Sequence, residues 1–526
     1  MIKELTLTVA PEVAHTTENL HNYIAVTEGI ELNSINGVRV LKKSLDARRS
    51  KLLVNIKCEV YVNEPMPEQS TEYVSYTNVS NGAPVHIIGC GPAGMFAALK
   101  CIELGKKPII IERGKNVQDR RRDLAAINRN QDVNTNSNYC FGEGGAGTYS
   151  DGKLYTRSGK RGSIDKILQV LVQHGADANI MVDAHPHIGT NKLPKIIADM
   201  RQTILDCGGE ILFNTKLIDF KIAKDKITTL ILEDTGTKTQ TDVNIHQVLL
   251  ATGHSARDIF ELLDKRNITI EAKTYALGVR VEHPQRIIDK RQYHCTSNEQ
   301  LDEVRQYLGP AAYSWVEQVQ GVGVYSFCMC PGGIIAPCAT DGDDIVTNGW
   351  SPSKRDNPYA NSGIVTTISE AQYKQFESHG ALAALRYQQW VEQRCFDVAG
   401  KSQIAPAQRL VDFCNNKISN SLPECSYQPG LKSMDMREAL PRYIVQNLQQ
   451  GFKQYAKKMP DYYTNEALIV APESRTSSPV RIPRDKEKYH HTSITNLFPC
   501  GEGAGFAGGI VSAAIDGENC VMAMVF

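Results

Sequence analysis

The alternation of apolar and polar positions changes along the chain and divides it into regions. Near the start, two alternating stretches, IKELTLTV (2–9) and LLVNIKCEVYV (52–62), flank the short helical pattern TTENLHNYIAVT (16–27). Strict alternation is typical of a strand with one solvated face. We therefore expect a small N-terminal α/β domain over residues 1–82, which the turn-rich segment YTNVSNGAP joins to the rest of the chain.

From Pro84 onward, longer apolar runs alternate with helical patterns. Short strand-like pieces between 209 and 251 predict a meander that leads into a buried strand, and the last forty residues again show strand, glycine loop and helix. The region 256–485 contains no glycine fingerprint. It mixes strands with helices, including one expected over EAQYKQFESHGALAALRYQQWVEQRC (370–395). The pattern as a whole predicts an α/β protein of several domains.

A glycine fingerprint lies between strand and helix in VHIIGCGPAGMFAALKCIELGKKPIIIERG. Gly89 permits a tight turn, Gly91 lets the backbone approach a pyrophosphate, and Gly94 lets helix and strand pack closely. Pro92 and Ala93 follow at the first turn of the helix, where proline is tolerated. Because the N–H groups of a helix N-terminus bind anions, this segment predicts a dinucleotide site.

An acidic residue stands at the end of the next predicted strand. Glu112 follows Gly94 by eighteen positions. A carboxylate about 20 residues after the fingerprint accepts hydrogen bonds from ribose hydroxyls and repels a 2′-phosphate. The expected nucleotide is therefore FAD or NAD rather than NADP.

Charge and cysteine content narrow the class of protein. The 526 residues contain equal numbers of basic and acidic side chains, so no whole-chain field favours a nucleic-acid or membrane partner. No signal peptide is evident, and no apolar run approaches the ~18 residues that cross a bilayer. The fourteen cysteines show neither CxxC nor zinc spacing, which predicts reduced thiols in a cytoplasmic protein.

The basic segment RVLKKSLDARRSK predicts a solvated face, with docking or nucleic-acid binding as the alternative.

Six ordered motifs carry a resemblance to a known family. They are GCGPAG, GGAGTYSDGKL, PHIGT (186–190), ATGHSARD, FCMCPGG (327–333) and GEGAGFAGGI. With them, the chain from about residue 84 to its C-terminus resembles the glutathione-reductase-like flavoproteins, and within these the FAD-dependent dehydrogenases. The resemblance implies FAD, and since no strong covalent-attachment motif is evident, we expect it to be bound non-covalently. The sequence contains only one nucleotide fingerprint, so NAD(P)H would dock transiently as an electron donor, or electrons would come from elsewhere.

The resemblance also implies how the chain is organised. A Rossmann-type FAD-binding domain would form from 84–255 together with 486–526, and 256–485 would be an inserted α+β domain facing the substrate. In the cofactor site, Gly508, Gly509 and Ile510 would open a helix aimed at the flavin, whose reduced form carries negative charge that a helix N-terminus stabilises. The complete set of candidate cofactor-binding residues is Gly89, Gly91, Pro92, Ala93, Gly94, Glu112, Arg113, Gly145, Ala146, Gly147, Thr148, Asp151, Leu217, Ala251, Thr252, Gly253, Gly501, Glu502, Gly508, Gly509 and Ile510.

Four residues are candidates for catalysis. Lys153 is a candidate to direct a cation or proton donor at flavin N5, with Asp151 orienting it, unless this loop only packs against the cofactor. Cys328 and Cys330 are candidates for dithiol exchange. Alternation along a strand would place these two side chains on opposite faces and strain a direct disulfide, so buried structural cysteine is the alternative. His254 is a candidate acid or base, or a helix cap.

These observations predict an FAD-dependent oxidoreductase that transfers hydride between a small molecule and flavin N5. The alternatives are a reductase that NAD(P)H drives, and a flavin-bound redox sensor or RNA-associated protein that uses the basic N-terminal domain. His185 and His187 lie two apart without further ligand spacing, so no metal site is expected.

Overall fold

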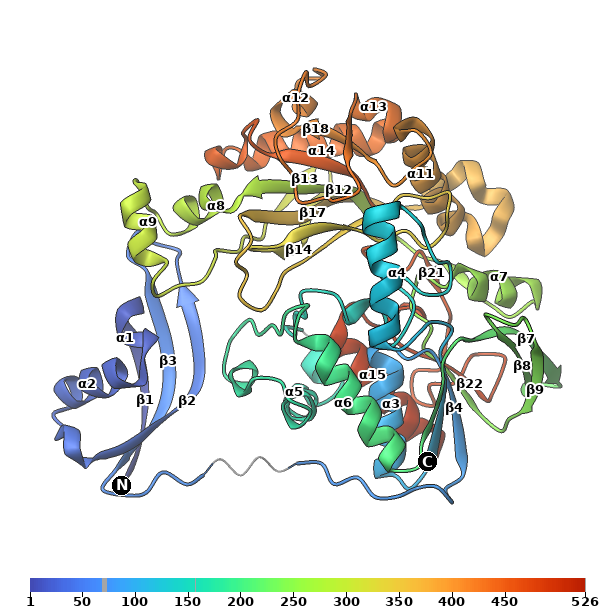
Figure 1. Ribbon diagram of the computed structural model, residues 1–526, viewed down its shortest axis with the longest axis horizontal. Helices are drawn as coiled ribbons and strands as arrows, with labels where there is room; N and C mark the ends of the chain where they lie inside the picture. Colours follow the sequence, from blue (N-terminus) through green and yellow to red (C-terminus); the bar gives the residue numbers. More distant parts are fainter. Residues whose placement is uncertain (69–72, 157, 526) are drawn as a thin grey trace.

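The structure is a computed structural model that describes residues 1–68, 73–156 and 158–525. The predicted α/β class is confirmed. The N-terminal segment, a parallel sheet and a larger mixed sheet occupy three different parts of the molecule (Figure 1).

The N-terminal segment forms a three-stranded antiparallel sheet of order β1-β3-β2 with two helices against it. Its elements are β1 (Ile2–Val9), α1 (Pro11–His15), α2 (Thr17–Glu28), β2 (Ile35–Asp46) and β3 (Leu53–Val62). Both predicted strands and the predicted helix are present. The helix begins where expected because the Thr16 side chain accepts a hydrogen bond from the Asn19 N–H at 3.1 Å. Ile24 and Ile56 lie in the core between helix and sheet.

The basic segment of this unit lies largely on strand β2, whose edge contacts the rest of the chain. The N–H of Lys43 donates to the Val182 carbonyl at 2.9 Å, and the N–H of Ala184 donates to the Lys43 carbonyl at 3.0 Å. Backbone pairing therefore fixes the N-terminal sheet against the segment around residues 182–184, so part of this basic strand docks on its own chain.

A five-stranded parallel sheet of order β22-β10-β4-β5-β6 lies beneath the mixed sheet in Figure 1. Its strands are β4 (Pro84–Ile88), β5 (Lys107–Ile111), β6 (Glu210–Leu212), β10 (Val248–Leu250) and β22 (Leu497–Pro499). Val248 pairs with His86 on one side and with Leu497 on the other. Residues near the C-terminus thus complete a sheet that begins at Pro84.

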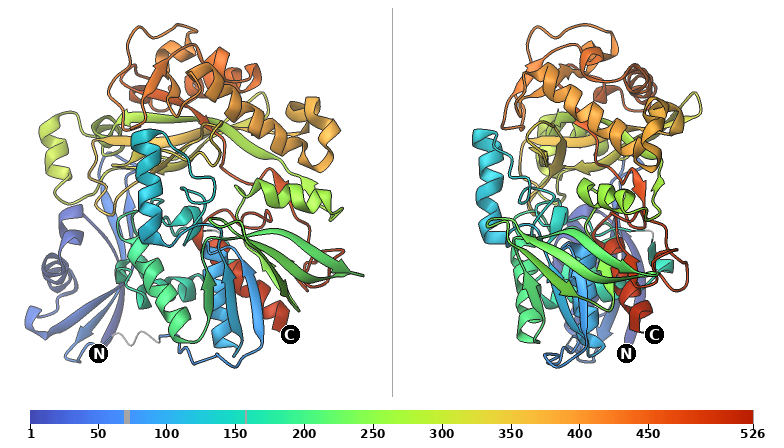
Figure 2. Two further views of the ribbon diagram at one scale, coloured as in Figure 1. Left: turned by 45° about the vertical axis from the view of Figure 1, so that its right-hand side comes forward. Right: turned by 90° about the vertical axis from the view of Figure 1, so that its right-hand side faces the viewer.

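Two helices pack closely on this sheet. Helix α3 (Pro92–Glu103) follows β4, and α15 (Ile510–Val525) follows β22; the two lie side by side in both views of Figure 2. A Cβ at Gly517 would lie 2.2 Å from the carbonyl oxygen of Ala93, so only glycine permits this approach. The close contact fixes the first turn of α3 against the middle of α15.

The larger sheet has seven strands in the order β13-β14-β17-β12-β20-β18-β19. They are β12 (Tyr275–Pro284), β13 (Val316–Val319), β14 (Val322–Cys330), β17 (Tyr359–Ile368), β18 (Ala405–Arg409), β19 (Leu431–Ser433) and β20 (Leu468–Glu473). The long helix expected over 370–395 is interrupted. It divides into α10 (Glu370–Tyr373), a 3₁₀ stretch and α11 (Ala383–Ala399), because Gly380 adopts φ 54° and ψ −124°.

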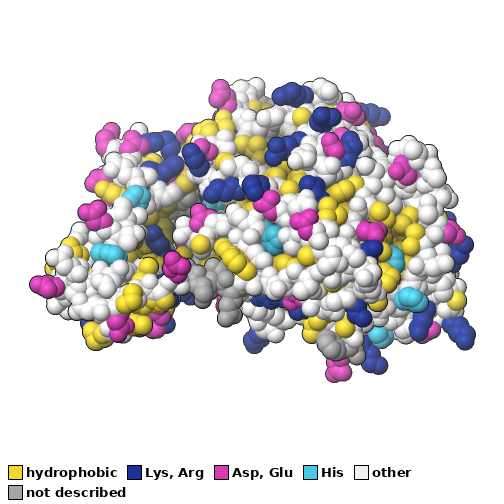
Figure 3. Space-filling view, turned by 60° about the horizontal axis from the view of Figure 1, so that its bottom comes forward, with side chains coloured by type: hydrophobic (Ala, Val, Ile, Leu, Met, Phe, Trp, Pro, Cys, Tyr) yellow, Lys and Arg dark blue, Asp and Glu magenta, His cyan; other side chains and the backbone are white. Residues whose placement is uncertain are grey.

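The expected meander is present as the antiparallel sheet β7-β8-β9. The remaining elements are β7 (Thr215–Ala223), β8 (Lys226–Asp234), β9 (Gln240–Asn244), β11 (Glu271–Ala272), β15 (Ile334–Pro337), β16 (Thr347–Trp350), β21 (Val480–Arg481), α4 (Val117–Asn130), α5 (Ile164–Gln173), α6 (Leu193–Asp206), α7 (Arg257–Lys265), α8 (Gln285–Gln292), α9 (Asn298–Val304), α12 (Leu410–Cys414), α13 (Met436–Ala439) and α14 (Arg442–Tyr455). Within the described residues, none of the helices combines the length and the apolar character that a membrane span requires. Acidic and basic side chains are interspersed over the face drawn in Figure 3.

Candidate functional site

A cavity of about 420 Å³ lies where the carboxyl ends of the parallel strands face the seven-stranded sheet. One wall consists of the loops that follow β4, β5, β10 and β22. The opposite wall contains Cys328, Asn348, Trp350 and Arg475. Ligands of open parallel sheets bind outside the carboxyl ends of the strands, and ligand pockets measure ~300–1,000 Å³. The cavity is therefore the candidate site.

The predicted fingerprint forms the turn from β4 into α3. Gly89 has φ 104°, and a Cβ there would lie 2.4 Å from the Ala251 carbonyl oxygen. Gly91 is the N-cap of α3, and Pro92 occupies the first turn. A Cβ at Gly94 would lie 2.0 Å from the Gly89 carbonyl oxygen, so Gly94 permits close packing of helix and strand. Since the first N–H groups of a helix have no intrahelical acceptor, they remain available to a phosphate.

Glu112 joins the glycine loops to each other. Its carboxylate is buried and accepts hydrogen bonds from the N–H groups of Cys90 at 2.8 Å, Gly114 at 2.8 Å and Gly142 at 3.0 Å. Two of these bonds reach Oε1 and one reaches Oε2, and the side chain also lines the cavity. The acid therefore holds the loops together, and Oε2 retains capacity for a ribose hydroxyl.

The walls that face the cavity have room for a bound group. A Cβ at Gly145 would lie 3.1 Å from the Cα of Gly91, so the two glycine loops touch. By contrast, a Cβ at Gly253, Gly508 or Gly509 would meet no atom within 4 Å, although all three residues line the cavity. These glycines leave a bare backbone surface after β10 and before α15, which matches the cradle of a dinucleotide.

Most of the candidate residues line this one cavity. The lining set includes Gly89, Gly91, Pro92, Ala93, Glu112, Arg113, Gly145, Ala146, Gly147, Asp151, Lys153, Leu217, Ala251, Thr252, Gly253, Cys328, Gly501, Glu502, Gly508, Gly509 and Ile510. Gly94, Thr148 and Cys330 lie behind the wall. The Thr148 hydroxyl is buried and donates to the Glu143 carbonyl at 2.7 Å.

Other lining residues have no motif that would reveal them in the sequence. Tyr139, Asn348, Trp350, Arg475 and Thr476 all contribute to the cavity. Tyr139 lies in the loop after α4, Asn348 and Trp350 lie on β16 of the two-stranded sheet β15-β16, and Arg475 and Thr476 follow β20 of the seven-stranded sheet. Sequence reasoning therefore predicted the cofactor-facing wall and missed most of the opposite one.

Lys153 lies on the cavity wall within a group of charges. Its Nζ is 3.0 Å from Asp151 Oδ2, and Arg355 approaches the same oxygen at 3.3 Å. Burial alone would raise the pKa of Asp151, but the charges of Lys153 and Arg355 outweigh it and lower that pKa. Burial would also lower the pKa of Lys153, but the neighbouring thiols and Asp151 raise it. Lys153 is therefore a cation at neutral pH, held by an ionised Asp151.

The expectation that Cys328 and Cys330 point to opposite faces is wrong. Cys328 has φ 48°, and the pairing of β14 with β17 shifts between Phe327 and Cys330. This bulge interrupts the alternation of side chains along the strand. As a result, Lys153 Nζ lies 3.5 Å from the Cys328 sulfur and 3.6 Å from the Cys330 sulfur.

Four buried charges connect α7 to the wall formed by the larger sheet. Glu392 Oε2 accepts from Arg257 at 2.5 Å and from Arg475 at 3.1 Å. Asp344 Oδ2 lies 2.8 Å from Arg475 and 3.6 Å from Arg257. Burial opposes the charge of Glu392, but the two guanidinium groups lower its pKa to about 2. Burial raises the pKa of the other acid, Asp344, to about 7. The two acids and two guanidinium groups together hold Arg475 at the cavity.

His254 and Glu502 face each other at the cavity with 3.8 Å between Nε2 and Oε1. Burial, together with Arg475 and Arg257, lowers the pKa of His254 to about 3. His254 is therefore neutral near pH 7 and does not form an ion pair with Glu502. Burial raises the pKa of Glu502 to about 7, which leaves this carboxyl able to hold or release a proton at neutral pH.

The depressed pKa of His254 predicts a pH effect on stability. Between pH 6.5 and pH 3 the unfolded chain protonates this histidine while the folded chain does not, so the unfolded state binds more protons and stability falls as the pH falls. From pH 7 to pH 5, wild type should lose about 2 kcal/mol more than His254→Gln. Urea unfolding at both pH values measures the difference. The exposed-residue control His379→Gln should follow wild type, and an equal pH response of all three proteins would contradict the assignment.

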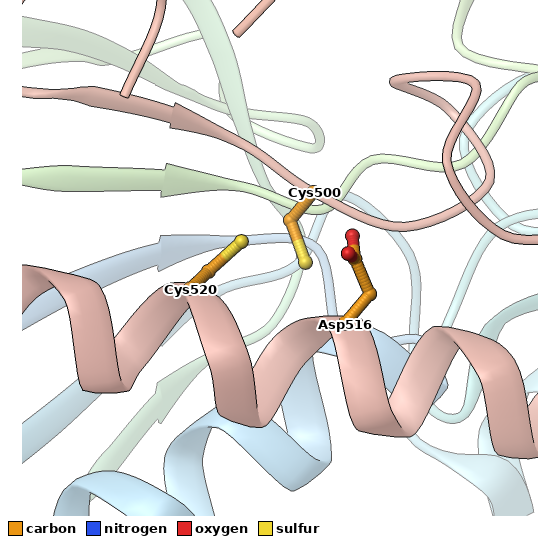
Figure 4. A group of neighbouring side chains, drawn as sticks. All are labelled: Cys500, Asp516 and Cys520. Carbon is orange, nitrogen blue, oxygen red and sulfur yellow. The ribbon is translucent and has the colours of Figure 1, made fainter. Parts of the chain in front are cut away.

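A buried group of Cys500, Asp516 and Cys520 has ligand atoms close enough to suggest a metal (Figure 4). However, Asp516 already accepts from Arg484 at 2.5 Å and 3.0 Å and from the Gly501 N–H at 2.7 Å. The guanidinium also lies 3.3 Å from the Cys520 sulfur. The guanidinium of Arg484 therefore takes the place that a metal ion would need. Asp516 instead holds the turn at Gly501, at the start of the terminal loop.

Comparison with known proteins defines the class. Residues 274–476 match the family described as FAD-dependent protein, C-terminal domain-like, and residues 1–61 match a domain of unknown function. An uncharacterised protein of Clostridium beijerinckii is 35% identical over 503 residues, which cover 92% of this chain and 91% of that protein. The chain belongs to the same family as this relative, and its residues 274–476 carry the domain described as that of FAD-dependent proteins.

Solved flavoprotein structures show weaker similarity. They include a flavocytochrome c3 fumarate reductase in its open conformation (11% identity, TM-score 0.34, covering 88% of this chain and 85% of that chain). A variant of the E. coli quinol fumarate reductase subunit FrdA gives 12% identity and a TM-score of 0.36, with 84% and 70% covered. A variant of the flavin-dependent brominase Bmp2 gives 11% identity and a TM-score of 0.36, with 84% of this chain and 80% of that chain covered. At these identities and TM-scores, the similarities bear no weight on the reaction.

Proposed function

We propose that the protein is an FAD-dependent oxidoreductase that exchanges hydride between flavin N5 and a small molecule in the cavity between its two large sheets. One observation carries the proposal: glycine loops with bare backbone form one wall, while Lys153, Cys328 and Trp350 belong to the rest of the same cavity. The first wall suits a dinucleotide, and the second offers groups that can orient a substrate.

The residues present fit FAD. The start of α3, Glu112 and the bare glycines at 253, 508 and 509 would hold it, since they combine helix N-terminal N–H groups, a ribose acceptor and open space. When bound, FAD supplies a two-electron acceptor that the protein side chains lack. The N-terminus of α15 lines the cavity and stabilises negative charge there.

Lys153 is proposed to orient the substrate. Its ammonium group is cationic at neutral pH, is anchored by Asp151 at 3.0 Å and is 35% exposed toward the cavity. It can therefore donate a hydrogen bond to a carbonyl, hydroxyl or carboxylate oxygen. Glu502, with its pKa of about 7, is a second group able to exchange a proton in the same cavity.

The experiment is an anaerobic titration of the purified flavoprotein. NADH, NADPH and a panel of small hydroxy and amino compounds are added in turn, and flavin absorbance is followed. We expect a compound of the hydroxy or amino panel to bleach the flavin and Lys153→Met to slow that bleaching about 100-fold, since misplacement of a bound substrate by about 1 Å costs about 10²-fold in rate. Lys153→Arg keeps the charge and serves as the matched control.

Two results would overturn the proposal. Protein that folds but retains no FAD would remove the cofactor assignment. Flavin that dithionite reduces, but that no member of the panel or nicotinamide reduces, would remove the hydride-transfer assignment. Bleaching by a nicotinamide alone would instead support the alternative of an NAD(P)H-driven reductase, in which that donor docks transiently.

A further inference from the structure

We propose that Cys328 and Cys330 form a reversible dithiol–disulfide couple that reduces a small disulfide-containing molecule in the cofactor cavity. Cys328 is the attacking thiolate, Cys330 is the resolving thiol, and Lys153 is the positioning residue that stabilises the thiolate. The exchange itself is independent of the function proposed above. Only regeneration of the dithiol rests on it, through the reduced flavin.

The bulge in β14 is the first observation. Three steps along β14, from Phe327 to Cys330, correspond to two steps along β17, from Gly363 to Asn361. The extra residue gives Cys328 its φ of 48°, a conformation that costs energy for a residue with a Cβ. Bulges of this kind re-aim side chains next to active sites. Here the bulge brings two sulfurs, which would otherwise point apart, to one ammonium group.

The distances make the pair a single unit. Both sulfurs lie within 3.6 Å of Lys153 Nζ, Cys328 lines the cavity, and Cys330 lies directly behind it. A half-buried first thiol on the cavity wall, backed by a buried second thiol, suits thiol–disulfide exchange, because the incoming disulfide can reach only the first.

Charges from several elements surround Cys328. Positive groups are Lys153 and Arg280, whose guanidinium donates to the Cys328 carbonyl at 3.1 Å. Two acids near Cys328 are already paired: Asp151 with Lys153, and Glu473 with Arg280 at 2.5 Å. A third acid, Glu502, is close enough for the charge of Cys328 to raise its pKa.

This environment shifts the pKa values of the two thiols in opposite directions. The hydrogen bond from Cys330, followed by Lys153 and Arg280, lowers the pKa of Cys328 well below its usual range, whereas the pKa of Cys330 is raised. Among the fourteen cysteines, the other pKa shifts that the structure resolves are upward, with burial as the main cause, as for Cys90 and Cys338. The geometry therefore selects one nucleophilic thiolate and one protonated neighbour.

The proposed exchange balances in atoms and electrons. The Cys328 thiolate attacks one sulfur of the substrate R–S–S–R, forms a Cys328–S–R bond and releases RS⁻. Cys330 gives up its proton and attacks the Cys328 sulfur, so that the protein disulfide forms and a second RS⁻ leaves. The two leaving groups take up protons from Cys330 and from solvent. The substrate gains two electrons and the cysteine pair loses two. Bound FAD, once reduced, would supply the two electrons and one proton that restore the thiolate and the thiol.

The test follows the cysteines rather than turnover. Reduced holoprotein is treated with cystamine at one equivalent, quenched in acid and mapped by mass spectrometry. We expect wild type to form the Cys328–Cys330 disulfide. Cys330→Ser should instead accumulate a cystamine adduct on Cys328, and Cys328→Ser should form neither product. Cys140→Ser is the matched control, because Cys140 also lines the cavity but its thiol donates to the Cys338 carbonyl at 3.9 Å; this variant should behave as wild type.

Lys153 is tested by a pH profile. Iodoacetamide labelling of Cys328 in Lys153→Gln should be at least 10-fold slower than in wild type at pH 7 and should recover as the pH is raised, while Lys153→Arg retains the fast rate. A merely structural role for Lys153 would not shift the profile.

Two outcomes would overturn the inference: absence of the Cys328–Cys330 disulfide in wild type together with absence of an adduct in Cys330→Ser, or equal reaction at Cys140 and Cys328. Neither readout depends on flavin bleaching. Failure of the proposed hydride transfer and failure of this inference are therefore distinguishable, because the disulfide can form in protein whose flavin no tested compound reduces.

Discussion

Replacing Gly508 with valine is expected to weaken FAD binding by about 10- to 100-fold. Gly508 lines the cavity just before α15, and a Cβ there meets no protein atom within 4 Å, so the new side chain would enter the space assigned to the cofactor. Forcing added methyl groups into a filled site costs about 1–3 kcal/mol, which corresponds to that change in Kd. Flavin retained after dialysis and a fluorescence titration with FAD measure the loss.

The apo form of this variant should melt near the apo wild-type temperature, because the valine contacts only the space of the cofactor. Gly309→Val is the matched control: a Cβ at Gly309 also meets nothing within 4 Å, and this exposed residue lies outside the cavity lining. It should bind FAD as wild type does. Full flavin retention by Gly508→Val would place the cofactor elsewhere.

Replacing Glu392 with glutamine is expected to destabilise the fold by about 3–5 kcal/mol. Glu392 is buried between Arg257 and Arg475, at 2.5 Å and 3.1 Å, and glutamine keeps its size while removing its charge. Two guanidinium groups would then share Asp344 alone, and a buried charge without full compensation carries this cost. At roughly 2–4 °C per kcal/mol, the thermal midpoint should fall by about 10 °C.

Glu261→Gln provides the comparison. Its carboxylate pairs with Arg386 at 2.7 Å, but its side chain is 41% exposed, so the expected change is within about 1 kcal/mol. Since Arg475 also lines the cavity, Glu392→Gln should lose some flavin as well. Equal thermal midpoints for the two variants would mean that the network contributes no more than a surface pair.

The local parts of this protein could be predicted because short-range rules govern them. The turn at Gly89 and the placement of Glu112 depend on the spacing of a few neighbouring residues and on the period of strand and helix. The same holds for the helix that Thr16 caps. Where a single residue breaks the period, prediction failed. Gly380 interrupts the expected helix, and the bulge at Cys328 reverses the expected orientation of a side chain.

The sequence by itself determined the α/β class, the glycine cradle and the acid beside it, since each depends on residues within one strand–turn–helix unit. Only the tertiary structure decided which groups face that cradle. Lys153 meets Cys328 across 175 positions, and Arg257 meets Glu392 across 135. The physical reason is that such pairs are set by sheet register, by a one-residue bulge and by how two sheets pack, and none of these leaves a periodic signal in the residues concerned.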